Sequence, residues 1–486
     1  MSASTQALLI IGVIVVGTIG FALLAVRRIE MGPTEFIVGG RSFGALLLWI
    51  LLAGEIYTST TFLGAAGWAY GKGAPAFFII AHGPIAYIIG YFYLPAAWRI
   101  GKERGLMTWP DFLIDRYGSK LLGKGVAVLQ FFLAVPYVTL QLTGLQILLT
   151  IAGYGRYNAT IAVSVAFLLT ALFVFTAGLR GAAWASIIKD SLVLGAAMFA
   201  GIYLPIRFFG SPGAMFERLS QTQPHWLSIH AGNAPYGVTW FISTVFLTSI
   251  GFFMGPASAQ SIFSARSEGI VRRNMIFMPF YGLMIVLMLL AEFTAAVIVP
   301  GLKGTAADQS YMLLLQKHFP AWILGIIAGA GCLAALIPAS VLLLGAASIF
   351  ARNVLGHTRY VRVLVLVCAV LSLALWIVAK TSLADLLLFY FNGVTQLAPG
   401  VIFGLSWKRV SAAAVGAGLV VGEAVAAYSL HASTGPMGIN WGLVALGCNV
   451  AVLTAVALVF PRCGGATSGS PRGSLRSWYA SRQRQQ

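Results

Sequence analysis

A carboxylic acid in the middle of a long apolar segment is the feature of this 486-residue sequence most suited to chemistry. It is Glu55, which follows Ala53 and Gly54 in a run that is otherwise apolar. A charged side chain at the centre of a membrane costs several kcal/mol on most estimates, so we expect a function for it. An apolar site also favours the neutral form of a carboxyl group, which suits reversible protonation.

Other ionisable residues within apolar runs have simpler explanations. Glu292 and Glu423 are expected to make packing hydrogen bonds or to lie near the lipid interface, and His82 is expected to be a packing histidine. Asp190 follows Lys189, which we interpret as an ion pair on the cytoplasmic side. No lysine or arginine is expected at mid-membrane. The sequence has no His/Asp or Cys/His cluster at catalytic or metal-binding spacing, so it does not predict an enzyme.

Hydroxyl and amide side chains occur in the apolar segment that contains Glu55 and in two others, at 121–152 and 238–262. Such groups commonly join membrane helices by hydrogen bonds, and they can also line a polar site, so the pattern is compatible with both roles. The candidates for solute binding are Tyr57, Thr58, Thr60, Thr61, Tyr137, Gln141, Ser243, Thr244, Thr248, Ser249 and Gln260.

The elements that position these residues must be helices that cross a membrane. Of all residues 59% are hydrophobic and 9% are charged, with a mean hydropathy of +0.88, whereas soluble proteins carry about 25% charged residues. This composition excludes a soluble enzyme, a disordered chain and a disulfide scaffold. A membrane helix needs about 20 apolar residues. Thirteen segments qualify, at about 6–26, 43–70, 75–98, 121–152, 158–178, 185–208, 238–262, 274–300, 320–350, 359–380, 383–406, 411–430 and 439–460.

The basic residues orient these spans. All but seven of the 31 lysines and arginines fall on one side if the N-terminus is outside, as the positive-inside rule requires of the cytoplasmic side. The net charge of +18 is therefore explained by orientation and by contact with anionic lipid heads, without a nucleic-acid partner. We expect a multi-pass protein of the plasma (inner) membrane with a cytoplasmic C-terminus. The seven outside residues are Lys72, Arg156, Arg207, Arg218, Lys303, Lys317 and Lys380.

Two of the spans are interrupted at matching positions. Gly54 weakens the second span, while Gly251, Gly255 and Pro256 weaken the seventh, which lies five spans later and has the opposite orientation. Interrupted helices in this arrangement are typical of transporters that are built from inverted repeats.

Three motifs resemble those of the sodium:solute symporter family. The family's Gly-x-Arg-x-x-x-Trp signature is matched at residues 178–190 by GLRGAAWASIIKD, its second signature at 260–274 by QSIFSARSEGIVRRN, and its ninth span at 331–353 by GCLAALIPASVLLLGAASIFARN. The resemblance covers residues 6–460 and implies an all-α membrane protein of about 13 helices, with a leucine-transporter-type core of two inverted five-helix repeats. In the first motif, Arg180, Lys189 and Asp190 are candidates for gating or cytoplasmic-side roles.

These expectations divide the chain into six parts. They are an N-terminal span and cytoplasmic loop (1–42), the first five-helix repeat (43–208, spans 2–6), an outside loop with a short interfacial helix (209–237), the second repeat (238–406, spans 7–11), two peripheral spans (407–460) and a disordered cytoplasmic tail (461–486).

A closer resemblance is to the monocarboxylate permease branch of that family. It is carried by AGEIYTSTTF at 53–62, RRNMIFMPFY at 272–281 and LIPASVLLLGAASIFARN at 336–353. Members of this branch take up lactate, pyruvate and related short acids, so the resemblance implies cation-coupled symport of a short monocarboxylate by alternating access. The alternatives are a sodium-coupled symporter of amino acids or other organic solutes, and a receptor-like member that transports nothing.

The family's sodium site is only partly supplied by this sequence. The resemblance implies ligands from the backbone carbonyls of Gly54, Tyr57 and Ala334, and from two hydroxyls that follow three and four residues after the last of these. Those two positions are Ile337 and Pro338, and neither offers a side-chain oxygen. Because sodium prefers several oxygen ligands, this loss should weaken the site seriously.

A shifted register could use Ser340 as a sodium ligand, but nothing in the sequence requires it. The coupling ion is therefore H⁺ or Na⁺, and of these two we prefer a proton, carried by Glu55 in place of sodium. No other cofactor is expected. The expected partners are a small organic solute and membrane lipid. The sequence does not predict an oligomeric state.

Overall fold

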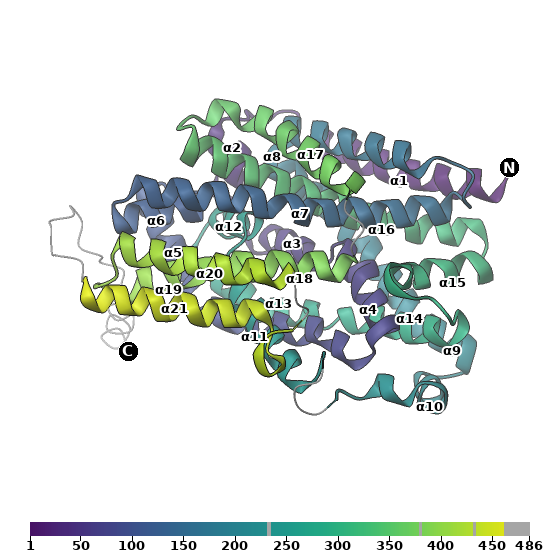
Figure 1. The fold of residues 1–486 in the computed structure, drawn as a ribbon. Coiled ribbons are helices and arrows are strands. Elements are labelled where there is room, and N and C mark those ends of the chain that lie inside the picture. Colours follow the sequence, from purple (N-terminus) through teal and green to yellow (C-terminus); the bar gives the residue numbers. More distant parts are fainter. Residues whose placement is uncertain (231–234, 379–381, 431–433, 461–486) are drawn as a thin grey trace, which may run out of the picture.

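The computed structural model describes residues 1–230, 235–378, 382–430 and 434–460, and these form helices joined by short connections (Figure 1). Most of the helices run side by side in one bundle, with the N-terminus at one end and the end of α21 (Trp441–Val459) at the other. The tail at 461–486 and Lys380, on which two of the expectations fall, lie outside the described residues.

The first half of the bundle is made of long helices and one broken pair. They are α1 (Ala3–Val26), the pair α3 (Ala45–Ile56) and α4 (Ala65–Lys72), α5 (Phe78–Arg104), α7 (Lys120–Ala152), α8 (Ala159–Met198) and α9 (Leu204–Phe209). The shorter α2 (Pro33–Val38) and α6 (Trp109–Tyr117) lie in the connections.

The second half repeats this pattern. It contains the broken pair α11 (Val238–Gly251) and α12 (Pro256–Ser264), then α13 (Glu268–Gly282), α14 (Ile285–Ile298), α16 (Ala321–Ile349), α17 (Val361–Val378), α18 (Leu383–Val394) and α19 (Ala398–Ser406). The connections hold α10 (Pro212–Thr222), where a short interfacial helix was expected, and α15 (Ser310–His318). The last two spans are α20 (Ala412–Ala427) and α21, which pack on each other.

The described residues contain ten helical segments that are long and apolar enough to cross a membrane, or twelve if each broken pair counts as one span. The longest segment, Ala159–Phe209, has 51 residues and would measure about 77 Å at 1.5 Å per residue, whereas a bilayer core is about 30 Å thick. It is interrupted at Gly178, whose φ of +57° lies in the left-handed region that glycine readily adopts. The segment therefore supplies two spans, which gives the thirteen that the sequence predicts.

The centre of the bundle is α16, whose residues are almost all buried against α1, α7 and α8. Its sequence is apolar on every side, as expected of a helix that is surrounded by protein. Pro338 lies inside this helix. Because proline has no N–H, the carbonyl of Ala334, four residues earlier, lacks its usual helical donor.

Ion pairs join the connections at the end of the bundle where α1, α5 and α19 finish, which we call the basic end (Figure 1). Arg352, just after α16, contacts Asp111 of α6 at 2.7 Å. Arg99 of α5 contacts Glu268 of α13 at 3.0 Å. A backbone bridge between Phe43 and Ala265 also ties the start of α3 to the end of α12. Both broken helices are thus anchored at the same end.

Candidate functional site

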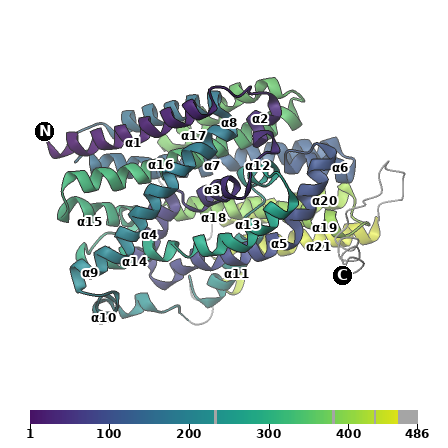
Figure 2. The ribbon, with the colours of Figure 1, turned by 180° about the vertical axis from the view of Figure 1, so that it is seen from behind.

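Two broken helices meet inside the bundle, as the sequence predicts. The axes of α3 and of the segment Thr60–Lys72 differ by 49°, and those of α11 and α12 also differ by 49°. Helices α3 and α12 lie next to each other in the interior (Figure 2). The first break begins at Tyr57, three residues after the glycine that was expected to cause it.

The backbone at the first break is hydrogen-bonded by side chains. Ser59 donates its N–H to Oε1 of Gln141 on α7 at 3.1 Å, and its hydroxyl donates to the same oxygen at 2.6 Å. The hydroxyl of Thr61 donates to the carbonyl of Ile56. The carbonyl of Tyr57 accepts a hydrogen bond from a lysine on α8, which is described below. Non-helical backbone at membrane depth requires such partners, because lipid offers none.

The second break is supported in the same way. The carbonyls of residues 252–254 accept hydrogen bonds from Ser258 at 3.1 Å, from the indole of Trp109 at 2.8 Å and from the side-chain amide of Gln130 at 2.6 Å. These donors come from α12, α6 and α7. Both interruptions are therefore built into the packing of the fold.

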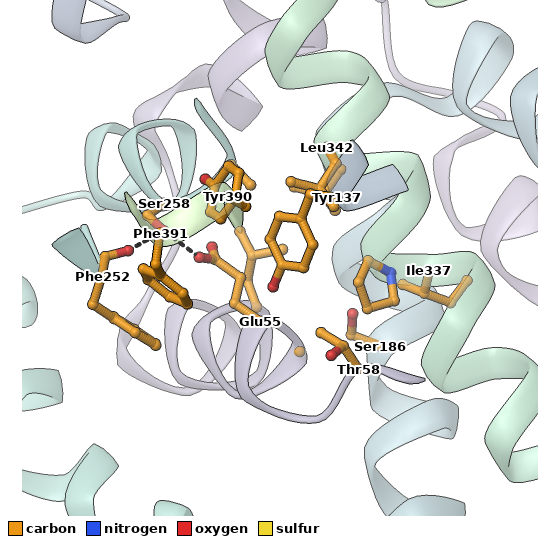
Figure 3. A pocket seen from close by; sticks show the side chains of 15 residues that line it. Glu55, Thr58, Tyr137, Ser186, Phe252, Ser258, Ile337, Leu342, Tyr390 and Phe391 are labelled. Atoms are coloured by element: carbon orange, nitrogen blue, oxygen red, sulfur yellow. Dashed lines mark hydrogen bonds between the residues drawn. The ribbon is translucent and has the colours of Figure 1, made fainter. Parts of the chain in front are cut away.

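Glu55, the last residue but one of α3, connects the two broken helices (Figure 3). Its Oε2 accepts a hydrogen bond from Ser258 at 2.6 Å, and its Oε1 accepts one from Ser261 at 2.5 Å. The two serines are three residues apart on α12, so they share one face of that helix. They were not among the residues that we expected at the site, although their spacing directly after Gly255 and Pro256 is visible in the sequence.

Glu55 also lines two small cavities, each with a volume of about 40 Å³. Both are bounded by Glu55, Thr58, Tyr137, Phe252 and Phe391. The first cavity, drawn in Figure 3, is further lined by Leu51, Gly54, Ser186, Ala257, Ser258, Ile337, Pro338, Val341, Leu342 and Tyr390. The second is further lined by Ile56, Thr60, Thr61, Ile79, Ile80, His82, Gly83, Gly282, Ile285 and Leu387.

Four of the expected solute-binding residues line these cavities, namely Thr58, Thr60, Thr61 and Tyr137. The aromatic ring of Tyr137 packs against that of Tyr390 on α18, with ring centroids 4.5 Å apart. The tyrosine at position 390 was not anticipated, because the sequence gives no sign that α18 would face the first break.

The other expected solute-binding residues contact neighbouring helices. Gln141 supports the first break, as described above. Ser249 donates to the carbonyl of His82 on α5 at 2.9 Å, and Gln260 donates to Ser348 on α16 at 3.4 Å. The ring of Tyr57 packs against that of Tyr281, with centroids 5.1 Å apart. These contacts correspond to the packing role that the sequence analysis left open for them.

Three further expected residues from α11, and Arg180 at the basic end, are also placed by their contacts. Ser243 and Thr244 bind the backbone N–H and side-chain amide of Asn440, which precedes α21. Thr248 donates to the carbonyl of Thr244 within α11. Arg180 pairs with Glu35 and lies at the basic end, on the cytoplasmic side of the predicted orientation.

Among the remaining buried carboxyl groups, Glu292 of α14 accepts a hydrogen bond from the hydroxyl of Ser310 on α15. It lies in neither cavity. Glu423 of α20 also lies outside both cavities, near Gly393 of α18. The hydrogen bond of Glu292 agrees with the packing role that was expected of it.

The expectation that no basic residue lies at mid-membrane was wrong. The side chain of Lys189 on α8 is fully buried, and its ammonium lies 2.6 Å from Oδ1 of Asp190. The same ammonium donates to the carbonyl of Tyr57 at 3.4 Å, so this ion pair lies at the first break and not on the cytoplasmic side. The reason is that the sixth span begins directly after Gly178, not at residue 185, which puts Lys189 about 16 Å along the helix.

The residues of the expected sodium site do not form a set of oxygen ligands. Ile337 and Pro338 line the first cavity with carbon atoms. The hydroxyl of Ser340 donates to the carbonyl of Ile337 at 2.6 Å within α16. The carbonyl of Tyr57 is already bound by Lys189. At most the backbone carbonyls of Gly54 and Ala334 remain as oxygen ligands, which is too few for a sodium ion.

A bundle of membrane-spanning helices in which two broken helices meet at a buried polar site is typical of secondary transporters. The chain belongs to the sodium:solute symporter family, whose model matches residues 36–422. This assigns the protein to multi-pass membrane proteins that carry out cation-coupled solute symport.

Two relatives and one solved structure illustrate the similarity. The chain is 35% identical over 475 residues to YhjB, an uncharacterized symporter of Bacillus subtilis (strain 168), covering 93% of this chain and 97% of that one. It is 28% identical over 459 residues to the monocarboxylate transport permease protein of Rhizobium johnstonii, covering 88% and 90%. The structure of a Na⁺-coupled sialic acid symporter in a substrate-bound outward-open state superimposes with a TM-score of 0.79 at 15% identity, covering 96% and 99%. This superposition confirms the predicted leucine-transporter-type fold.

Proposed function

We propose that this protein takes up a short monocarboxylate, such as pyruvate or lactate, together with a proton that Glu55 carries. The observation that carries the proposal is the position of Glu55. Its carboxyl group is hydrogen-bonded to Ser258 and Ser261 on the opposite broken helix, and the residue lines both cavities. A change in its charge would therefore act on both broken helices and on both cavities.

The size of the cavities favours a small solute. One buried water needs a cavity volume of about 10–15 Å³. A cavity of about 40 Å³ therefore has room for only a few waters. Acids with a few non-hydrogen atoms suit this space better than sugars do. The similarity to a protein named as a monocarboxylate transport permease supports the same class of solute.

The charge of the site explains why proton and solute would move together. A carboxylate solute that enters next to an ionised Glu55 is repelled, whereas a protonated Glu55 permits it to approach the N-terminal end of α12. Unpaired N–H groups and the helix dipole favour an anion there. Coupling follows if proton and solute each favour the same conformation of the bundle. One proton with one monocarboxylate carries no net charge.

Uptake into proteoliposomes tests the proposal. Purified protein is supplied with labelled pyruvate, lactate, acetate or proline while the outside is made acidic. We expect the three acids to accumulate and proline not to. Accumulation of proline in preference to the acids would favour the amino-acid alternative, and failure of the folded protein to transport any solute would favour a receptor-like protein.

The variant Glu55→Gln tests the role of the carboxyl group. We expect it to exchange labelled for unlabelled pyruvate but not to accumulate pyruvate when the outside is acidic, because its amide resembles a permanently protonated acid. The matched control is Glu423→Gln, a buried carboxyl group outside both cavities, which should accumulate pyruvate as the wild type does. Proton-driven accumulation at the full rate by Glu55→Gln would contradict the proposal.

A further inference from the structure

A buried lysine lies beside two of the residues from which the family resemblance implies a sodium site, Gly54 and Tyr57. The side chain of Lys189 has no exposed surface, and that of Asp190 is 8% exposed. A lysine is almost never fully buried unless it is paired, so the neighbouring carboxylate explains how the charge is tolerated. It does not explain why the ammonium points to the first break.

The ammonium lies against the end of α3. It donates to the carbonyl of Tyr57 at 3.4 Å. A Cβ atom added to Gly54 would lie 3.3 Å from the same nitrogen and 3.4 Å from the hydroxyl of Ser186. The lysine thus reaches the two residues whose carbonyls were the expected sodium ligands of this helix. Because the C-terminal end of a helix carries partial negative charge, a cation is favoured there.

The side of the expected sodium site that α16 forms also lacks the ligands that the family resemblance implies. Ile337 and Pro338 stand where the family's two hydroxyls would be, and both line the cavity that Gly54 and Ser186 also line. A fixed ammonium needs no hydroxyl ligands from α16. It has three N–H donors, and Pro338 leaves the buried carbonyl of Ala334 without its helical donor. This wall therefore supplies a spare acceptor and no ligand set for sodium.

We propose that the ammonium of Lys189 is a built-in cation that replaces sodium between α3, α8 and α16. Because it is covalently attached, it stabilises the broken helix without crossing the membrane. Sodium then does not bind at this position, so a sodium gradient cannot drive uptake through it. Another cation must be transported together with the solute. The proposal concerns the cation alone and holds whichever solute the protein carries.

Sodium binding by the wild-type protein gives a test that needs no solute. Purified protein in detergent is incubated with radioactive ²²Na⁺, and its thermal unfolding is recorded in NaCl, KCl and choline chloride at equal ionic strength. We expect no saturable sodium binding and the same unfolding midpoint in all three salts. Saturable binding, or stabilisation by sodium alone, would overturn the proposal even if the solute has been identified correctly.

A double variant tests whether the ammonium itself is needed. Lys189→Met with Asp190→Asn removes both charges together and keeps the volume of the pair, so no unpaired charge is left buried. If the wild type exchanges pyruvate, we expect exchange by the double variant to be about tenfold slower, a loss typical of a coupling free energy between sites. Exchange of pyruvate at the wild-type rate by a double variant with the wild-type unfolding midpoint would overturn the proposal.

Discussion

Replacing Gly255 with alanine should disrupt the packing of the second broken helix against α18. The glycine precedes α12 with φ −69° and ψ 157°, an extended conformation that alanine also adopts. The expected effect is therefore steric. The new Cβ would lie 2.1 Å from the hydroxyl oxygen of Tyr390, whereas real Cβ contacts are essentially never under 3.0 Å.

The magnitude follows from how Tyr390 is held. Its ring contacts those of Tyr137 and Phe391, with centroid distances of 4.5 and 5.5 Å, and these contacts restrict its movement away from the glycine. Overpacking of this kind typically costs about 1–3 kcal/mol. The next atom of the ring, Cζ, lies 3.5 Å from the added Cβ, which is an ordinary contact. Removing the hydroxyl with Tyr390→Phe should therefore relieve the clash.

The assay is a double-mutant cycle. Thermal unfolding midpoints and pyruvate exchange rates are measured for the wild type, Gly255→Ala, Tyr390→Phe and the double variant in the same detergent and lipid. The double variant should match Tyr390→Phe, and Gly255→Ala should be the least stable of the four. The control is Gly195→Ala, where no atom lies within 4 Å of the added Cβ. Its unfolding midpoint should match that of the wild type. The reasoning fails if Gly255→Ala is as stable as the wild type, or if Tyr390→Phe does not rescue it.

Two further predictions concern Gln141 and Asp308. Gln141→Leu removes both hydrogen bonds from Ser59 to this side chain; the hydroxyl can still donate to the carbonyl of Leu140, so one buried group, the N–H, is left unsatisfied. Because one such group costs about 1–3 kcal/mol, pyruvate exchange should fall about 5- to 150-fold. Gln141→Glu keeps an acceptor and should lose less; equal losses would contradict this. Asp308 lies in the connection before α15, where burial raises its pKa to about 7. The folded protein then holds a proton that the unfolded chain releases above its ordinary pKa of 3.8, so stability should fall as the pH rises from about 4 to 7. Asp308→Asn should flatten this dependence of the unfolding midpoint on pH, and an unchanged slope would refute the assignment.

Periodicity and composition were sufficient to predict the framework of this fold. Length of apolar runs located the spans, and glycine and proline marked both interruptions. The hydroxyl residues that follow Glu55 could be identified as cavity-lining candidates because they follow it within the same predicted span. Thr58 faces both cavities, whereas Ser59, one residue later, turns away to Gln141. That difference depends on the unwound backbone, which sequence spacing does not describe.

The position of Lys189 could not be predicted for a related reason. Its depth depends on where α8 turns back, and the turn at Gly178 requires a positive φ that glycine allows but does not demand. Placing the start of the sixth span a few residues too late moved the lysine to the membrane surface. Likewise, Ser258 and Tyr390 reach the site only through contacts between distant helices.

The central claim is that a proton, and not sodium, drives uptake through the site around Glu55. The most direct test imposes the two gradients separately on proteoliposomes that contain the wild-type protein and measures accumulation of labelled pyruvate. The account predicts accumulation when the outside is acidic and sodium is absent, with no further gain from an inward sodium gradient. Accumulation that requires sodium and is insensitive to pH would contradict it.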